Sequence, residues 1–229
     1  MTFVFAPAPQ VALPIVGMDV LFPVHRIYCV GQNYAAHARE MGSTERAAPF
    51  FFSKPADAVL LVADGTIGRM PYPSATTNLH HEVELVVAIG IGGKNIAPTD
   101  AAAHIFGYAI GLDMTRRDLQ AEAKKLGRPW STAKGFDHSA PIGPIHPARS
   151  GLPGGAISLS INGTTRQHGQ IDDMIWSVTE TIGVLSTLFE LQPGDLIFTG
   201  TPEGVGAVVE GDLMVASIDG LGTLQVDIG

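Results

Sequence analysis

Cysteine is almost absent from this sequence of 229 residues, which contains only Cys29. A single thiol cannot form a disulfide within the chain, so the sequence does not belong to the disulfide-stabilised class of small secreted domains. Cys29 lies in the apolar run 27–30. Free cysteine is among the most frequently buried residue types, so we predict that Cys29 is a core thiol.

Positive charge and long apolar runs are also scarce. Lys and Arg number 14 against 22 Asp and Glu, a net charge of −8, whereas a general nucleic-acid-binding protein needs a basic face. The longest apolar runs, such as 85–91, are too short to cross a bilayer. The first basic residue is Arg26, although a secretory signal carries its positive charge before the apolar stretch. We therefore expect a cytoplasmic protein with no nucleic-acid partner and no membrane partner.

Glycine and proline are by contrast abundant, at 27 and 16 residues, and favour the many turns of a β-rich fold. Hydrophobic residues make up 45% of the chain, enough for a sizeable core. Residues 1–24, rich in proline, are typical of an N-terminal arm, and residues 25–229 form one predicted domain. The patterns predict strands at 27–30, 49–55, 82–91 and 108–112, and a hairpin turning at Asn162-Gly163. They predict helices at 33–41, 99–106 (capped by Thr99), 116–126 (with Gly127 as its C-terminal cap) and 172–191 (capped by Asp172 or Asp173).

Three carboxylates stand at the ends of predicted strands. Glu82 and Glu84 are two residues apart, so on a strand they share one face, and Asp113 directly follows another strand. Converging carboxylates make a site for a hard divalent cation such as Mg²⁺ or Mn²⁺. The alternative is two exposed glutamates and one helix-capping aspartate. His80 and His81 are adjacent to Glu82, but no zinc-ligand spacing such as HExxH occurs.

A candidate acid–base pair lies on the short predicted helix 33–41. His37 and Glu40 are three residues apart and share a helix face. A glutamate beside a histidine orients the ring and favours its protonated form, so the pair can serve as a general base for water. An exposed surface pair is the alternative.

Polar residues near Asp113 are candidates for substrate binding. Arg117 and Gln120 are three residues apart on the next predicted helix and could bind the oxygens of a metal-held ligand. They could equally form an ordinary charged helix face. Lys134 lies between apolar residues and glycine, where it could stabilise a developing enolate or direct its ammonium to solvent.

Taken together, five segments resemble the fumarylacetoacetate hydrolase superfamily, in the family's order and over roughly residues 25–229. These segments are 28–40 (YCVGQNYAAHARE), 81–85 (HEVEL), 111–120 (GLDMTRRDLQ), 134–137 (KGFD) and 194–206 (GDLIFTGTPEGVG). Within the superfamily, the arm before 22–28 (FPVHRIY) and the run 49–55 (PFFFSKP) resemble the fumarylpyruvate hydrolases of gentisate breakdown.

The resemblance implies an α+β fold of mixed β-roll or sandwich type with short flanking helices, and a homodimer. It implies one Mg²⁺ or Mn²⁺ per subunit, held by Glu82, Glu84 and Asp113. It makes His37 and Glu40 a water-activating dyad on a lid that orders over the substrate. Around the substrate it places Arg117, Gln120, Lys134 and Thr201.

The activity implied is hydrolysis of a carbon–carbon bond in a small 2,4-diketo acid, namely 3-fumarylpyruvate to fumarate and pyruvate. The distal fumaryl carboxylate needs a second cation, for which Arg116 or Arg39 is the candidate. Two alternatives stay open. One is an acylpyruvate hydrolase or oxaloacetate decarboxylase with the same site, and the other is a non-catalytic metal-binding dimer.

Overall fold

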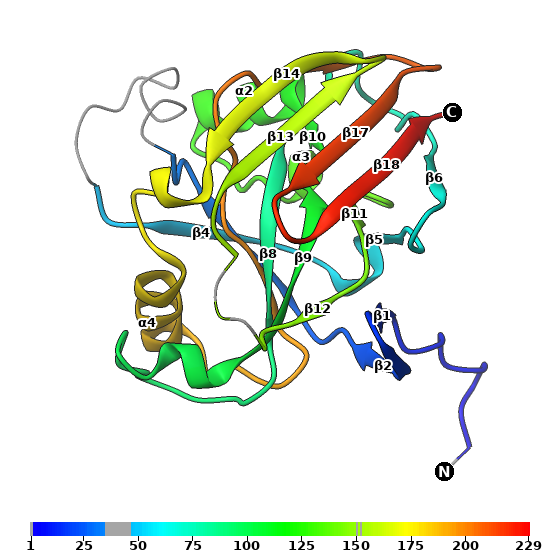
Figure 1. Cartoon of the computed structure of the whole chain (residues 1–229). Helices are drawn as coiled ribbons and strands as arrows, with labels where there is room; N and C mark the ends of the chain where they lie inside the picture. The colour runs from blue at the N-terminus through cyan, green and yellow to red at the C-terminus, as the bar shows by residue number, and fades with distance from the viewer. Residues whose placement is uncertain (1, 35–46, 150, 152) are drawn as a thin grey trace.

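The computed structural model describes residues 2–34, 47–149, 151 and 153–229, and it is built on two packed β-sheets (Figure 1). The larger, eight-stranded sheet contains β3 (Ile27–Gly31), β4 (Phe50–Lys54), β5 (Val59–Leu61), β8 (Val83–Ile89), β9 (Ile105–Leu112), β11 (Ala140–Ile142), β12 (His146–Pro147) and β15 (Leu196–Phe198). The five-stranded sheet contains β6 (Ile67–Met70), β13 (Ala156–Ile161), β14 (Thr164–Gln170), β17 (Leu213–Ile218) and β18 (Gly222–Ile228). A two-stranded sheet pairs β1 (Ala12–Ile15) with β2 (Met18–Pro23). A three-stranded sheet contains β7 (Leu79–His81), β10 (Thr115–Arg116) and β16 (Gly206–Val208).

The strand order is β4-β3-β15-β8-β9-β11-β5 in the larger sheet, where β12 also pairs with β9, and β14-β13-β17-β18-β6 in the other. In Figure 1 the second sheet lies across β8 and β9. The helices are α2 (Arg117–Leu126), α3 (Ser131–Lys134) and α4 (Val178–Leu188), with 3₁₀ turns η1 (Ala56–Ala58), η2 (Ala101–His104) and η3 (Ile171–Asp173). This predominance of strands with a few short helices confirms the predicted α+β sheet fold. Among the described helices, none is long and apolar enough to span a membrane.

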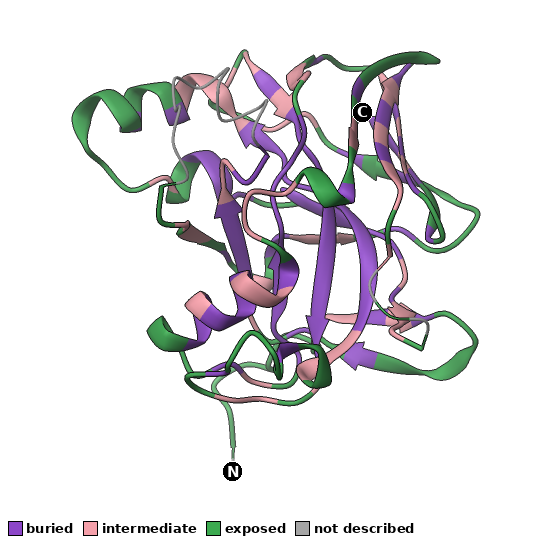
Figure 2. Cartoon of the chain, turned by 60° about the vertical axis from the view of Figure 1, so that its left-hand side comes forward, coloured by how far each residue is buried: buried purple, intermediate pink, exposed green. Residues whose placement is uncertain are grey.

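The central strand β8 is buried along its whole length, as the buried interior in Figure 2 shows. Its side chains alternate between two apolar clusters. Val83, Leu85 and Val87 join the cluster shared with the five-stranded sheet. Val86 and Ala88 join a cluster on the opposite face. A strand covered on both faces reads as a continuous apolar run, which is why this segment could be predicted as a strand entering the core.

The N-terminal residues pack onto this second cluster. Leu13 of β1 and Phe22 of β2 are buried there, and Cys29 joins them as the predicted core thiol. Val20 and Leu21 on β2 face solvent. The division into an arm of residues 1–24 and a domain of residues 25–229 stays a prediction.

The predicted hairpin turn and the predicted C-terminal cap of α2 both have the expected backbone geometry. Asn162 and Gly163 both have positive φ, 50° and 79°, as a type I′ hairpin turn requires, and they join β13 to β14. Helix α2 ends at Gly127, whose φ of 62° places it in the left-handed region.

Two predicted helices were wrong in extent. Residues 99–106 contain the short turn η2 and the start of β9, where Ile105 pairs with Ile89 in the main sheet. The N-cap position of η2 is Asp100 rather than Thr99. The helix predicted at 172–191 begins at Val178 instead. Neither Asp172 nor Asp173 caps it: they lie in the separate turn η3.

The cap of α4 is Ser177, which forms a capping box with Glu180. The Glu180 backbone N–H donates to Ser177 Oγ at 3.3 Å, and the Ser177 N–H donates to Glu180 Oε2 at 3.0 Å. This reciprocal pair satisfies two of the free donors at the helix start. The helix predicted at 33–41 falls mostly outside the described residues.

Candidate active site

The antiparallel pairing of β8 and β9 brings the three predicted carboxylates together. Val83 pairs with Leu112, so the beginning of β8 lies beside the end of β9. The Asp113 N–H then donates to the Glu82 carbonyl at 2.8 Å. One oxygen from each of Glu82, Glu84 and Asp113 lies within 4.8 Å of the others, and all three residues are buried.

Three cationic side chains neutralise most of this cluster. Lys134, at the end of α3, places Nζ 2.9 Å from Glu82 Oε2 and 2.6 Å from Asp113 Oδ2. The Lys54 ammonium lies 2.8 Å from Asp113 Oδ1, and Arg117 lies 2.5 Å from Glu82 Oε1. Burial alone would lower the pKa of Lys134, but Asp113 and Glu82 hold it above its usual value. Lys134 is therefore a fixed positive charge rather than a proton acceptor.

Glu84 forms no ion pair with any cation in the described part of the chain. Its Oε2 accepts a hydrogen bond of 2.8 Å from the Gly200 N–H. Burial raises the pKa of Glu84 well above its usual range, and repulsion from Asp113 and Glu82 raises it further. A positive charge placed among these oxygens would offset the repulsion between the carboxylates and favour the ionised form of Glu84.

These donors fit a hard divalent cation. Mg²⁺ and Mn²⁺ prefer oxygen ligands, and the cluster offers three carboxylates at one buried point. Without a metal, the three carboxylates and the three cations Lys54, Lys134 and Arg117 sum to zero formal charge. A divalent cation would leave an excess of two positive charges, which suits an anionic ligand.

Arg117 is held at three of its nitrogens. It donates to Gln120 Oε1 at 2.6 Å and to Glu82 Oε1 at 2.5 Å, and its Nε lies 3.3 Å from His80 Nδ1. The other ring nitrogen of His80 lies 2.9 Å from Asn78 Oδ1. Burial, assisted by Arg117, lowers the pKa of His80 to about 4. A neutral ring with its proton on Nε2 satisfies both contacts and orients the guanidinium.

Gln167, on β14, joins the carboxylate strand to the glycine-rich loop. Its Oε1 accepts from the Val83 N–H at 3.0 Å and lies 2.9 Å from His81 Nδ1. Its Nε2 donates to Thr201 Oγ1 at 2.8 Å and to the Pro202 carbonyl at 2.9 Å. The buried amide therefore has its hydrogen-bonding capacity filled, and it fixes Thr201 relative to the carboxylates.

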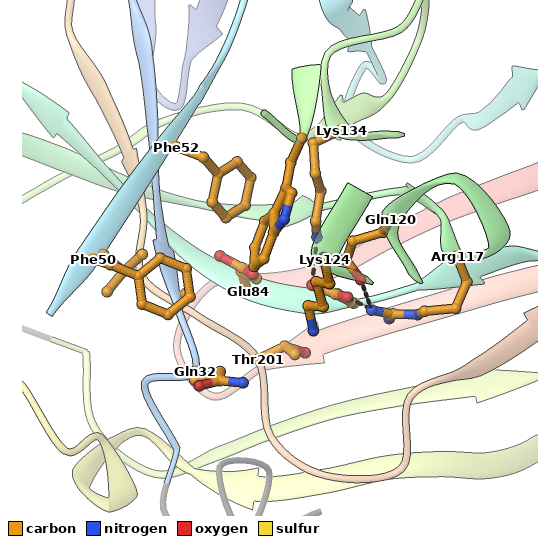
Figure 3. Close-up of a pocket in the computed structure, with 13 residues that line it drawn as sticks. Gln32, Phe50, Phe52, Glu84, Arg117, Gln120, Lys124, Lys134 and Thr201 are labelled. Atoms are coloured by element: carbon orange, nitrogen blue, oxygen red, sulfur yellow. Dashed lines mark hydrogen bonds and ion pairs between the residues drawn. The ribbon is translucent and has the colours of Figure 1, made fainter. Parts of the chain in front are cut away.

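A cavity opens above the cluster, with an empty volume of about 350 Å³ including its mouth. Figure 3 shows Glu84, Lys134, Gln120 and Arg117 on its lining, with Phe50 and Phe52 opposite the polar side chains. The full lining is Val30, Gly31, Gln32, Phe50, Phe52, Glu82, Glu84, Arg117, Gln120, Lys124, Trp130, Lys134 and Thr201.

The structure thus brings together most of the predicted site residues but not all of them. Arg116 is not on the cavity lining: it donates to the Thr132 carbonyl at 3.2 Å, and its guanidinium lies 4.4 Å from the centre of the Phe136 ring. This placement does not support the predicted contact between Arg116 and substrate. His37 and Glu40 lie outside the described residues, as does Arg39.

Among the residues that the structure places at the site without a predicted role are Lys54, Lys124 and Gln167. Lys54 had a detectable signal, since it is a lysine at the end of an aromatic strand. Lys124 had one too, because it follows Gln120 by four residues on the same helix. Gln167 had none, because its partners lie more than thirty residues away along the chain.

Comparison with known proteins defines the class of this fold and site. The family model described as fumarylacetoacetate (FAA) hydrolase, C-terminal, matches residues 26–228. The chain belongs to the fumarylacetoacetate hydrolase family, as the resemblance predicted. It is an enzyme, a hydrolase of that family, which excludes the non-catalytic alternative.

Three relatives with known names show which activities occur in proteins similar to this chain. A crystal structure of fumarylpyruvate hydrolase from Pseudomonas aeruginosa in complex with Mn²⁺ and pyruvate is 58% identical, has a TM-score of 0.97 and is matched over 99% of each chain. A fumarylpyruvate hydrolase of a Ralstonia species is 45% identical over 82% of this chain and 95% of its own. An oxaloacetate tautomerase of Escherichia coli is 40% identical over 87% and 90%. A divalent cation as cofactor, predicted from the carboxylates, is confirmed.

Proposed function

We propose that this enzyme hydrolyses the carbon–carbon bond of 3-fumarylpyruvate to give fumarate and pyruvate, as in gentisate-type aromatic degradation. The observation that carries the proposal is the buried cluster of Glu82, Glu84 and Asp113 beside Lys134 and Arg117. It is supported by the 58% identity to a fumarylpyruvate hydrolase whose structure holds Mn²⁺ and pyruvate, a product of this reaction.

In this proposal, Glu82, Glu84 and Asp113 hold one Mg²⁺ or Mn²⁺ per subunit. The bound cation supplies the positive charge that binds and polarises the 2-oxo acid end of the substrate. Arg117 and Gln120 bind oxygens at the same end, since Arg117 contacts both Glu82 and Gln120 and the two residues line the cavity. Thr201 lines the cavity too, but its hydroxyl proton is directed to the Val83 carbonyl at 2.8 Å, so its Oγ1 offers a ligand an acceptor.

The proposed reaction adds water to the distal carbonyl carbon and breaks the bond to the adjacent methylene. Glu40 orients His37, which takes a proton from the attacking water. The electron pair of the broken bond passes to pyruvate as its enolate, and the water oxygen becomes part of the new fumarate carboxylate. Two N–H groups of Lys134 bind Glu82 and Asp113, and the third can reach the enolate oxygen and stabilise its charge.

A second candidate is chemistry on oxaloacetate at the same site, because an oxaloacetate tautomerase of E. coli is 40% identical and an oxaloacetate decarboxylase of Dictyostelium discoideum is also 40% identical. Hydrolysis of simpler acylpyruvates is the related alternative. Decarboxylation and tautomerisation need no attacking water, so they would depend differently on His37.

A substrate panel separates these candidates. Fumarylpyruvate, acetylpyruvate and oxaloacetate are each mixed with purified enzyme that contains Mn²⁺. A matched sample contains a chelator instead, and the products are quantified by NMR. We expect metal-dependent formation of equal amounts of fumarate and pyruvate. Turnover of oxaloacetate alone would overturn the proposed substrate. A homodimeric assembly and a cytoplasmic location remain part of the proposal.

A further inference from the structure

One face of α2 extends the active site from its floor to its mouth. Arg117, Gln120 and Lys124 occupy positions i, i+3 and i+7 of this helix, so they share a face, and all three line the cavity. Arg117 and Gln120 lie at the carboxylate cluster. Lys124 follows Arg117 by seven residues, which is about 10 Å along the axis of an α-helix. Its side chain is exposed. In Figure 3 its ammonium points toward the same opening as Thr201 and Gln32.

The charged group of Lys124 faces this opening. No carboxylate among the described residues forms an ion pair with it. Its Nζ lies 5.1 Å from the centre of the Trp130 ring, a cation–π contact that holds the side chain over the aromatic wall. Although Lys124 stays exposed to solvent, the partial burial of its side chain lowers its pKa, and the positive charge of Arg117 lowers it further, while Glu82 acts in the opposite direction. A ligand carboxylate would supply the missing partner.

The wall beside Lys124 is aromatic. The Phe50 ring lies 5.5 Å from Trp130 at an interplanar angle of 88°, and the Phe52 ring lies 5.6 Å from Trp130. Flat apolar surfaces between two charged ends suit a planar, conjugated chain that carries a negative group at each end.

We propose that Lys124 binds the distal carboxylate of the substrate and thereby selects linear 2-oxo dicarboxylates over 2-oxo monocarboxylates. This inference rests on the proposed function for the orientation of the ligand, whose 2-oxo acid end lies at the carboxylate cluster. Lys124 takes the role predicted for Arg116, whose guanidinium is held over Phe136 outside the cavity.

The chain offers a matched control for the test. Lys125 is the next residue on α2, is also exposed and is absent from the cavity lining. Lys124→Met removes the charge but keeps an unbranched apolar side chain over Trp130, and Lys125→Met makes the same change about 100° around the helix. Lys124→Arg restores the positive charge.

The first measurement is binding, which is independent of turnover. Calorimetry on Mn²⁺-loaded protein compares 2-oxoadipate with 2-oxohexanoate, which have the same chain length but end in a carboxylate and a methyl group. We expect the wild type and Lys125→Met to prefer the diacid by roughly 10- to 100-fold, the value of a charge-assisted hydrogen bond. Lys124→Met should lose most of this preference, and Lys124→Arg should recover part of it.

The second measurement is kcat/KM for fumarylpyruvate and acetylpyruvate. Lys124→Met should lose activity on fumarylpyruvate, mainly through KM, and keep its activity on acetylpyruvate. An unchanged diacid preference in Lys124→Met, or none in the wild type, would overturn the role of Lys124. If the preference for the diacid depends on Lys124 but the enzyme cleaves neither fumarylpyruvate nor acetylpyruvate, the proposed function would be overturned instead. Failure of the wild type to bind either 2-oxo acid would contradict both.

Discussion

Replacing Glu84 with glutamine should weaken metal binding without lowering the stability of the metal-free fold. The Glu84 oxygen lies within 4.8 Å of those of Glu82 and Asp113. At an effective dielectric constant of about 20, two unit charges at that distance repel by about 3.5 kcal/mol. The three nearby cations offset much of this, and the raised pKa of Glu84 limits how often it is charged without metal. Glutamine removes the charge, and its carbonyl oxygen can still accept from the Gly200 N–H.

The chelated variant should therefore unfold at a temperature no lower than the chelated wild type, and up to a few degrees higher. Mn²⁺ at 100 times its Kd stabilises the wild type by about 2.7 kcal/mol, which for a chain of this length raises Tm by about 5–10 °C. Glu84→Gln should lose most of that increment in thermal scans with and without Mn²⁺, while the exposed control Glu210→Gln should keep it. A variant that unfolds several degrees lower when chelated, or retains the full Mn²⁺ increment, would refute the reasoning.

Further predictions concern the residues around the cluster. Lys54→Met breaks a buried ion pair with Asp113 and should lower the free energy of unfolding by about 3–5 kcal/mol in urea titrations; a loss below 1 kcal/mol would show that the pair is dispensable. Gln167→Leu leaves the buried Val83 N–H without its acceptor and should cost about 1–3 kcal/mol, again by urea unfolding, whereas an unchanged midpoint would contradict this. Arg117→Lys keeps the charge but loses the planar fork, so steady-state kinetics should show KM about tenfold higher while thermal scans show the Mn²⁺ increment retained. Loss of that increment would mean that Arg117 shapes the metal site itself.

The carboxylate cluster could be predicted from the sequence because local rules determine most of it. Glu82 and Glu84 share a face through the two-residue repeat of a strand. Asp113 follows the strand that pairs next to theirs in the antiparallel sheet. Arg117 and Gln120 share a helix face through the 3.6-residue repeat. Each of these relations involves residues that are close in sequence or on adjacent strands.

The residues that hold the carboxylate cluster in place, and the start of α4, could not be predicted in the same way. Gln167 of β14, in the five-stranded sheet, meets His81 of β7, which lies 86 residues earlier in the chain and in the three-stranded sheet. Sequence spacing does not predict a contact between strands of different sheets. Lys54 reaches Asp113 within the larger sheet, although β3, β15 and β8 lie between β4 and β9 in the strand order. The start of α4 was missed although Ser177 and Glu180 have the spacing of a capping box, because the two aspartates upstream offered a competing cap.

Hydrolytic cleavage of the carbon–carbon bond can be followed by isotope labelling, because it incorporates an oxygen atom of water into one product. Fumarylpyruvate is incubated with the Mn²⁺-loaded enzyme in ¹⁸O-labelled water, and the products are analysed by mass spectrometry at early times. We expect one ¹⁸O atom in the fumarate carboxylate and none introduced by the enzyme into pyruvate, with loss of both products on chelation. Recovery of intact fumarylpyruvate with only keto–enol exchange would contradict hydrolytic cleavage.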